Sequence, residues 1–360
     1  MSAHRTGLAH LPLHGGHAPP WLFQRMTRLA REIVAAIVVE AGPDEVLRRL
    51  SDPYWFQAFG CVLGYDWHSI GVTTTVCGAL RAGLSGTEHD LGLFVVGGKG
   101  RTAIATPSHI DSVGHLISAN PEKLKHASRM AARVDNVALQ DGYDLYHHSM
   151  FFTGKGSWAI VQQGMNTSNR YARRYHWLGE AVADFTCEPH SAICSDNTQN
   201  VLNLVARESD QARSSIARLP SDFNEESLRH ELSRIRVLSM PRREYVAAGD
   251  IDEVRIARLV MQMRDSSTNN FEGVLAQRGV GQKAMRALAL IADIIYGAPT
   301  SLRDPATYSF AHGGKDGYPF PVDREVYDNS IRTLAEAVRR AGIADSERRE
   351  ALARLLGRRP

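Results

Sequence analysis

Cysteine and lysine are both scarce in this 360-residue chain. The only cysteines are Cys61, Cys77, Cys187 and Cys194, and their spacing matches neither a zinc ribbon nor a C-x-x-C redox motif. A chain of this length buries a core without disulfides, and a small number of cysteines is typical of proteins in a reducing compartment. We therefore expect a cytoplasmic protein.

Long apolar runs are absent as well. The most apolar early segment, Ile33 to Val39, is far too short to span a bilayer, and residues 1–20 lack the features of a signal peptide. The composition, 43% hydrophobic and 22% charged, is that of a globular protein. We expect a soluble protein without a membrane partner, and the sequence leaves open whether it forms an oligomer.

The formal charge is only +3, but it is unevenly distributed. Only six of the 42 basic residues are Lys, and the other 36 are Arg. Arginine is suited to bidentate contact with phosphate, although a GC-rich genome produces the same bias. The positive charge gathers in Arg170, Arg173 and Arg174 and in the tail after residue 331, so a near-neutral sum conceals candidate phosphate-binding surfaces.

Residue patterns predict an α+β protein that is predominantly helical. The candidate helices are 21–41, 44–50, 71–84, a helix from Thr106, 121–140, 196–217, 223–237, 251–265, 281–297, 323–341 and 345–357. A strand is expected over 91–96, and two strands, 143–152 and 157–163, flank a four-residue hairpin turn. We predict two domains: a mixed α/β domain with a small sheet over 1–195, which we expect to be catalytic, and an all-helical domain over 196–360.

The most specific local pattern lies in the second of these domains. The segment Phe271 to Leu288 reads FEGVLAQRGVGQKAMRAL, in which two apolar helices meet at Gly279-Val280-Gly281. It resembles a helix-hairpin-helix motif, whose exposed backbone amides and second helix N-terminus bind DNA phosphate. We expect Gly279, Gly281, Lys283 and Arg286 to contact DNA; a plain pair of packed helices is the alternative.

The same segment is similar to the hairpin of helix-hairpin-helix DNA glycosylases. That resemblance implies a Schiff-base lysine at Lys283 and an acid at Asp323. Asp323 lies 40 residues beyond Lys283, farther than the usual spacing, and no four-cysteine cluster follows. Phosphate contact by Lys283 is therefore favoured over Schiff-base chemistry.

A wider resemblance covers most of the chain. The stretches RTGLAHLPLHGGHAPPWLFQRM, DPYWFQAFGCVLGYDWHS, LQDGYDLYHHSMFF, GVGQKAMRALAL and FAHGGKDGYPFPVDREVYD resemble the uncharacterised domain-of-unknown-function 763 family of archaea and bacteria. The family implies no activity, and a role on DNA is only what its hairpin implies.

Polar residues gather around the predicted β-hairpin. The candidate catalytic residues are Asp135, Asp141, Asp144, His147, His148, Gln163, Arg173, Arg174 and His176. On a strand, His147 and His148 face opposite ways. Asp141, Asp144 and His148 are candidate ligands for Mg²⁺ or Mn²⁺, which would activate water for attack on a phosphodiester. A nuclease of the PD-(D/E)xK type would need E-x-K on the next strand, which here reads AIVQQG. Structural histidines at a solvated strand edge are the alternative.

Two further segments are candidate phosphate contacts. Residues 169–177, NRYARRYHW, interleave bases with aromatics, as in a groove that stacks bases or on a solvated helix face. Arg173, Arg174 and His176 would then stabilise the phosphate in the transition state. Lys99 follows Gly97-Gly98 in a glycine-rich segment without Walker spacing, so we expect DNA contact but no ATPase.

Three functions follow from these patterns. The first is a divalent-metal-dependent nuclease in DNA repair, a hydrolase with its catalytic residues in the first domain and its DNA contact in the second. The second is a DNA N-glycosylase or lyase that uses Lys283 and Asp323. The third is a DNA-binding adaptor without enzymatic activity.

Overall fold

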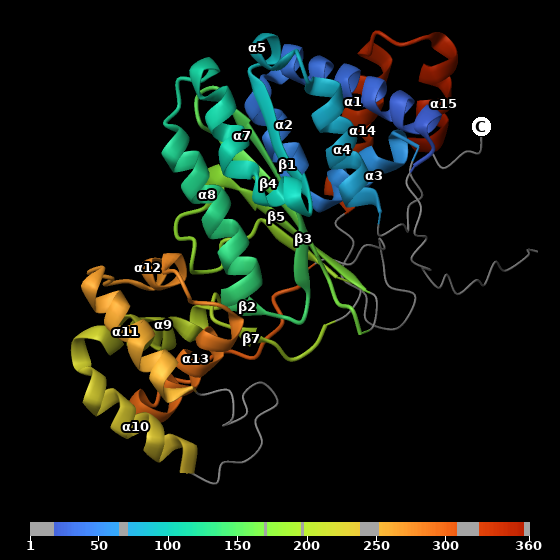
Figure 1. Ribbon diagram of the computed structural model, residues 1–360. Helices are drawn as coiled ribbons and strands as arrows, with labels where there is room; N and C mark the ends of the chain where they lie inside the picture. Colours follow the sequence, from blue (N-terminus) through green and yellow to red (C-terminus); the bar gives the residue numbers. More distant parts are fainter. Residues whose placement is uncertain are drawn as a thin grey trace, which may run out of the picture.

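The computed structural model describes residues 18–64, 71–168, 171–195, 198–237, 252–307 and 324–355. As predicted, the fold is α+β and predominantly helical (Figure 1). Five antiparallel strands form the sheet in the order β1-β3-β4-β5-β6: β1 (Leu93–Lys99), β3 (Asp144–Thr153), β4 (Trp158–Met165), β5 (Ala172–Leu178) and β6 (Ala192–Cys194). Two short strands, β2 (Leu139–Gln140) and β7 (Leu202–Asn203), pair separately.

Helices from both ends of the chain cover one face of the sheet. They are α1 (Pro20–Ala41), α2 (Pro43–Ser51), α3 (Pro53–Val62), α4 (Val72–Leu84), α14 (Arg324–Arg340) and α15 (Asp345–Leu355). Their buried residues, such as Ile33, Phe59 and Leu334, share one core with Phe151 and Val161 of the sheet. The last two helices therefore complete a layer that the first four begin (Figure 1).

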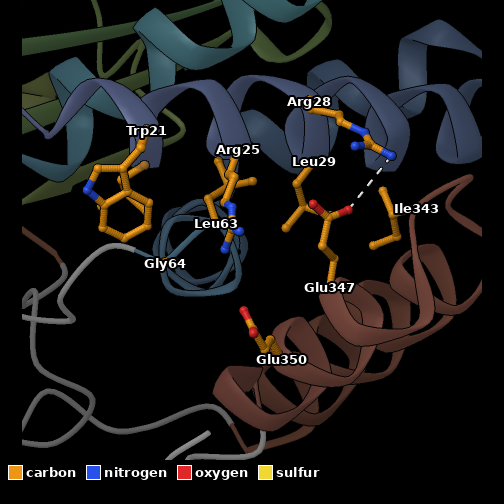
Figure 2. A pocket seen from close by; sticks show the side chains of 10 residues that line it. Trp21, Arg25, Arg28, Leu29, Leu63, Gly64, Ile343, Glu347 and Glu350 are labelled. Carbon is orange, nitrogen blue, oxygen red and sulfur yellow. Dashed lines mark ion pairs between the residues drawn. The ribbon is translucent and has the colours of Figure 1, made fainter.

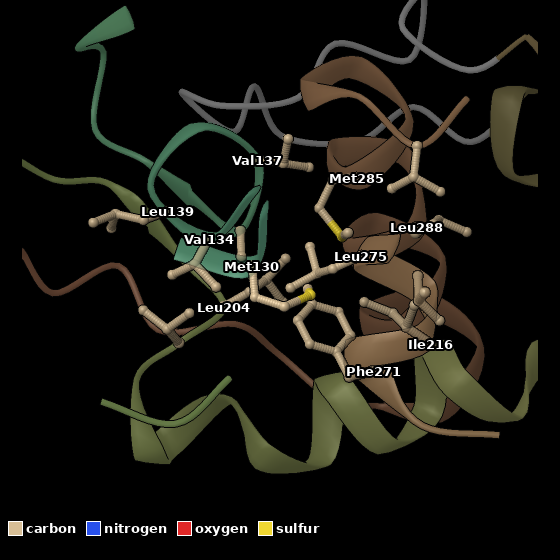
Figure 3. Close-up of a cluster of buried hydrophobic side chains, with 14 of the residues drawn as sticks. Met130, Val134, Val137, Leu139, Leu204, Ile216, Phe271, Leu275, Met285 and Leu288 are labelled. Carbon is tan, nitrogen blue, oxygen red and sulfur yellow. The ribbon is translucent and has the colours of Figure 1, made fainter. Parts of the chain in front are cut away.

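The other helices share a core with the opposite face of the sheet. They are α7 (Thr106–Val113), α8 (Pro121–Arg133), α9 (Asp210–Asp222), α10 (Glu225–Val237), α11 (Glu253–Asp265), α12 (Phe271–Ala276) and α13 (Gln282–Tyr296). The short α5 (Glu88–Leu91) and α6 (Arg101–Ile104) lie beside β1, and Leu91 of α5 packs against the first core. A π-helical turn, Val134–Ala138, ends α8. Figure 3 shows Met130 and Val134 meeting Leu275 and Met285 of α12 and α13. The C-terminal hairpin thus rests directly on α8.

Helix α3 and the region before α9 are two of the segments that differ from their predicted structure. Helix α3 was not expected, because its aromatic, glycine-containing sequence shows no clear helical period; Asp52 caps it by accepting from the N–H groups of Tyr54 and Trp55 at 2.8 and 3.0 Å. The predicted helix over 196–217 is wrong over its first half, where the chain forms β7 and a turn before α9 starts at Asp210. In both places contacts with the rest of the fold outweigh local propensity.

The predicted boundary near residue 195 stays a prediction. The contacts group the chain differently from the two predicted ranges, because one core joins residues from Phe94 to Ala306 and the other joins Met26 to Ala351. Among the described helices, none is both long and apolar enough to cross a membrane.

Candidate functional site

Strand alternation divides the polar residues of the sheet between its two faces. His148 pairs with Gln162 across β3 and β4, and the neighbouring register pair is His147 with Gln163. Successive residues point to opposite faces. His148 and Gln162 therefore face α8, whereas His147 faces α4, and the predicted opposition of the two histidines is confirmed.

A buried chain of hydrogen bonds crosses the α8 face. Nε2 of His148 lies 2.8 Å from Oγ of Ser128, and its Nδ1 lies 2.8 Å from Oε1 of Gln162. Nε2 of Gln162 donates to Oδ2 of Asp135 at 2.5 Å. Because the Gln162 amide must donate to the carboxylate, its oxygen accepts from His148, which makes His148 Nε2 the acceptor for the Ser128 hydroxyl. Burial lowers the pKa of His148, so the imidazole stays neutral.

Asp135 is the other end of this chain. It is fully buried and also accepts from Nε1 of Trp177 at 3.0 Å and from Nε2 of His190. Within the described part of the chain, these three hydrogen bonds to the carboxylate come from other side chains. Asp135 and His148 are thus brought together through Gln162, but as an interior network that solvent does not reach.

A second buried network surrounds Arg173 on the same face. Its guanidinium donates to Asp141 at 2.9 Å and to both carboxylate oxygens of Asp304 at 3.0 and 2.8 Å. Tyr175 donates to the same Asp141 oxygen at 2.7 Å, and the Arg173 guanidinium lies over the ring of Tyr143. Burial alone would lower the pKa of Arg173, but the carboxylates raise it, so the guanidinium stays charged. Burial raises the pKa of Asp141, although Arg173 and Tyr175 oppose that shift.

Arg174 and His176 face the opposite side, toward α2 and α3. Arg174 Nε donates to His176 Nε2 at 2.9 Å, and His176 Nδ1 donates to the carbonyl oxygen of Leu50 at 3.0 Å. Arg174 also reaches Gln57 and lies over the ring of Phe56. Burial and the Arg174 charge hold the pKa of His176 far below its usual range. Its neutral tautomer is thereby set by its two partners.

His147 lies on this face beside Ser149 and Cys77. The Ser149 hydroxyl is 3.0 Å from His147 Nε2, and within the described part of the chain His147 Nδ1 has no hydrogen-bond partner. Burial, together with His148 and Lys99, lowers the pKa of His147 to about 3. Burial also raises the pKa of the Cys77 thiol to about 12, so Cys77 is not a reactive thiolate.

The structure separates several residues that were predicted to act together. Arg173 and Arg174 lie on opposite faces and cannot hold one phosphate. Residues 172–177, expected in a groove or on a solvated helix face, instead form the buried strand β5, because both faces of the sheet are covered. Arg173, Arg174 and His176 are all almost fully buried.

The predicted metal ligands are not assembled either. Asp141 is engaged by Arg173 and Tyr175, His148 by Ser128 and Gln162, and Asp144 is exposed at the start of β3. Among the described residues, no three His, Cys, Asp or Glu side chains form a group that could hold a metal ion.

The glycines before Lys99 also differ from expectation, whereas DNA contact by Lys99 itself stays a prediction. Gly97 and Gly98 belong to strand β1 rather than to a phosphate loop, and Gly97 has a φ of +87°. A Cβ on Gly97 would lie 2.2 Å from the His148 carbonyl oxygen, so this glycine permits close strand pairing. Lys99 is exposed, with its Nζ 5.7 Å from the centre of the Tyr146 ring.

At the α12–α13 hairpin, two helices meet at the glycine pair, and the helix-hairpin-helix assignment itself stays a prediction. Val280 is buried, while Arg278, Gly279 and Lys283 are exposed. Gly279 has a φ of +93°, which favours glycine. Gly281 stands at the N-cap of α13 with an ordinary φ of −111°, and a Cβ placed there would meet no atom within 4 Å.

The hairpin is fastened to α8 by Arg133. Its Nε donates to the carbonyl oxygen of Leu275 at 2.6 Å, and its Nη2 donates to that of Val280. These two carbonyls belong to the end of α12 and to the turn. One side chain of the first predicted domain thus fixes the turn of the second.

A polar cleft of about 720 Å³ opens beside the hairpin. Asp144, Gln282 and Arg286 line it, together with Gln140, Gln199 and Asn200. Gln282 Nε2 lies 3.3 Å from Asp144 Oδ1, and Arg286 donates to Gln140 Oε1 at 2.9 Å. Sequence reasoning missed the amide residues here, although Gln282 lies inside the motif that it singled out.

A second hollow, of about 270 Å³, lies between α1, the end of α3 and α15. Figure 2 shows Trp21 and Arg25 on one wall and Glu347 and Glu350 opposite. Arg28 Nη2 approaches Glu347 Oε2 at 3.8 Å. No residue of the predicted site lines this hollow.

Comparisons with known proteins identify the family and nothing more specific. Neither the curated proteins nor the solved structures contain a match to this chain. One family, described as protein of unknown function (DUF763), matches residues 7–322, which is most of the chain. The chain therefore belongs to the DUF763 family.

Proposed function

We propose that this protein binds DNA through its backbone phosphates at the α12–α13 hairpin. The observation that carries the proposal is Gly281. Nothing in the described structure requires glycine there, since its φ is ordinary and a Cβ would meet open space. A glycine without an internal reason is expected where a ligand approaches the backbone closely.

The surroundings of Gly281 suit an anion. It begins α13, whose first N–H groups have no partner within the helix and whose dipole favours negative charge. Exposed Arg278 and Lys283 lie on either side in the sequence. Contacts of this kind position a protein on DNA without reading its sequence. We therefore expect binding that is strongly salt-dependent and weakly sequence-dependent.

Two substitutions at Gly281 test this directly. Asn and Asp have nearly the same size, and both are better N-caps than Gly, so Gly281→Asn and Gly281→Asp should fold at least as stably as the wild type. Only Asp places a negative charge where the phosphate would lie, so we expect Gly281→Asp to bind labelled DNA at least about tenfold more weakly than Gly281→Asn.

Fluorescence anisotropy with duplex and single-stranded oligonucleotides, over a series of salt concentrations, measures this difference. Equal affinity of the two variants would show that no phosphate lies at Gly281. Failure of the wild-type protein to bind either DNA form at low salt would remove the proposal altogether.

DNA cleavage is a second candidate, supported by the exposed carboxylate of Asp144 in the cleft beside the hairpin. Incubating labelled DNA with and without Mn²⁺ tests it: metal-dependent cuts that Asp144→Asn abolishes support a nuclease. Metal-independent cuts at damaged bases, trapped by borohydride on Lys283, would instead support a lyase; its proposed partner Asp323 lies outside the described residues. Intact but bound DNA leaves phosphate binding as the function.

A further inference from the structure

The cleft and the hairpin share residues at the start of α13. Gln282 is the first residue of that helix and lines the cleft, while its neighbour Gly281 forms the N-cap. Arg286, one turn further on, forms part of the same wall. A phosphate held at the N-terminus of α13 would therefore leave the attached nucleoside at the mouth of the cleft.

The lining of the cleft suits a nucleobase better than a metal or a polyphosphate. Its polar lining contains four side-chain amides, one guanidinium and two carboxylates, of which Asp141 is already bound by Arg173 and Tyr175 and Asp144 is exposed. The amides and the guanidinium are those of Gln140, Gln199, Asn200, Gln282 and Arg286. Amides offer a donor and an acceptor side by side, which matches the pattern on the edges of bases. A divalent cation would need several carboxylates, and a polyphosphate would need several cations.

The walls are held in place by the interior networks described above. Gln199 donates from its backbone to Asp304 at 3.0 Å and from its side chain to the carbonyl oxygen of Asp141. Both acids are bound by buried Arg173. On the other wall, Gln140 Nε2 donates to the carbonyl oxygen of Gln282 at 3.0 Å. The side chains of a cleft with fixed walls lose little conformational entropy when a ligand binds.

The size of the cleft agrees with this chemistry. Its volume of about 720 Å³ lies within the range of pockets that enclose small organic ligands. We propose that the cleft between the β2–β3 turn and α13 accepts one nucleotide of the strand whose phosphate the hairpin binds. This inference rests on the proposed function, because it takes the phosphate at Gly281 as its anchor.

The probes are the four 5′-deoxynucleoside monophosphates and the corresponding nucleosides. We expect at least one monophosphate to bind the full-length protein, as measured by calorimetry or NMR titration. Asn200 is exposed in the lining, so Asn200→Trp fills the cleft without disturbing the core. It should weaken monophosphate binding by about tenfold or more. Asn269→Trp, at an exposed position outside the lining, is the matched control and should bind as the wild type does.

The outcomes separate the two proposals. If no monophosphate binds at about 10 mM, or if Asn200→Trp binds it as well as Asn269→Trp does, the cleft proposal is wrong even when Gly281→Asp still loses DNA binding. If monophosphates bind in the cleft but Gly281→Asp keeps wild-type DNA affinity, the phosphate site of the hairpin is wrong and the cleft stands alone. If nucleosides bind as tightly as monophosphates, the phosphate does not contribute to binding, and the proposal that the hairpin anchors it is wrong.

Discussion

The sheet and the hairpin both contain basic residues but hold them in different surroundings. In the sheet, Arg173 and Arg174 are almost fully buried and donate to groups of the protein itself. In the hairpin, Arg278 and Lys283 are exposed beside a glycine whose Cβ position is open. A cluster of arginines in a sequence is therefore not by itself a phosphate site. What distinguishes binding from structural charge is whether the protein already supplies the counter-charge.

The largest expected effect is on stability and lies in the sheet. Arg173→Ala leaves Asp141 and Asp304 buried without their counter-ion, which should lower the free energy of unfolding by about 3–5 kcal/mol. Urea denaturation at neutral pH measures it. Arg28→Ala removes a partly exposed arginine whose partner lies 3.8 Å away, and it should cost less than about 1 kcal/mol. Equal stability of the two variants would contradict a structural role for Arg173.

Arg133 connects the two regions, so its loss should affect both. Arg133→Ala removes two hydrogen bonds to carbonyl oxygens of the hairpin and should cost about 1–3 kcal/mol in unfolding free energy. DNA affinity should fall with it, because the turn loses its support. Denaturation and anisotropy are measured on the same preparation, with the exposed neighbour Arg129→Ala as the stability control. If stability falls but DNA affinity is unchanged, DNA binding at the hairpin does not depend on the hydrogen bonds from Arg133.

The third effect is a pH dependence of the sheet. The pKa of His147 falls from its ordinary value near 6.5 to about 3 on folding, so the unfolded chain binds a proton that the folded chain does not. Its contribution to stability is complete above pH ~6.5 and is lost as pH falls toward 3, at up to ~1.4 kcal/mol per pH unit. His147→Gln should flatten the decline in unfolding free energy between pH 6.5 and 5, where His147 becomes protonated in the unfolded chain but stays neutral in the folded one.

Exposed His89 provides the control for that slope. His89→Gln should leave the pH dependence as it is in the wild type, because its side chain is 85% exposed. Parallel curves for the wild type and His147→Gln would contradict a neutral, buried His147.

The smallest effect on stability is expected in the hairpin. Lys283→Ala should change the unfolding free energy by no more than about 0.5 kcal/mol, because Lys283 is exposed. It should nevertheless weaken DNA binding and reduce the slope of log affinity against log salt by about 0.9 for duplex DNA. Lys155→Ala, in the turn at the far end of β3, should change neither quantity. An unchanged salt slope would exclude Lys283 from phosphate contact.

Most of the helices could be predicted from periodicity and caps, and the β3–β4 hairpin from its turn. The turn between α12 and α13 was predictable because the residues that define it are close in sequence: two glycines, a buried Val280 and the start of a helix lie within a few residues. Helix α3 and strand β5 were not, because neither shows a clear local period and both are stabilised by the burial of most of their residues against the rest of the fold. The partners of the buried side chains could not be predicted from sequence, because they are far apart in the chain: Arg173 and Asp304 are separated by 131 positions.

The return of α14 and α15 to the first helices has a consequence for synthesis. Leu334 and Val338 complete a core that begins with Met26 and Ile33, roughly 300 positions earlier. A chain emerging from the ribosome therefore exposes the parts of α1 and α3 that pack against α14 and α15 until those two helices have been translated. The α9–α13 helices, whose contacts are mostly with one another and with α8, have their partners sooner. During translation, the hairpin region can mature before the layer that encloses the start of the chain.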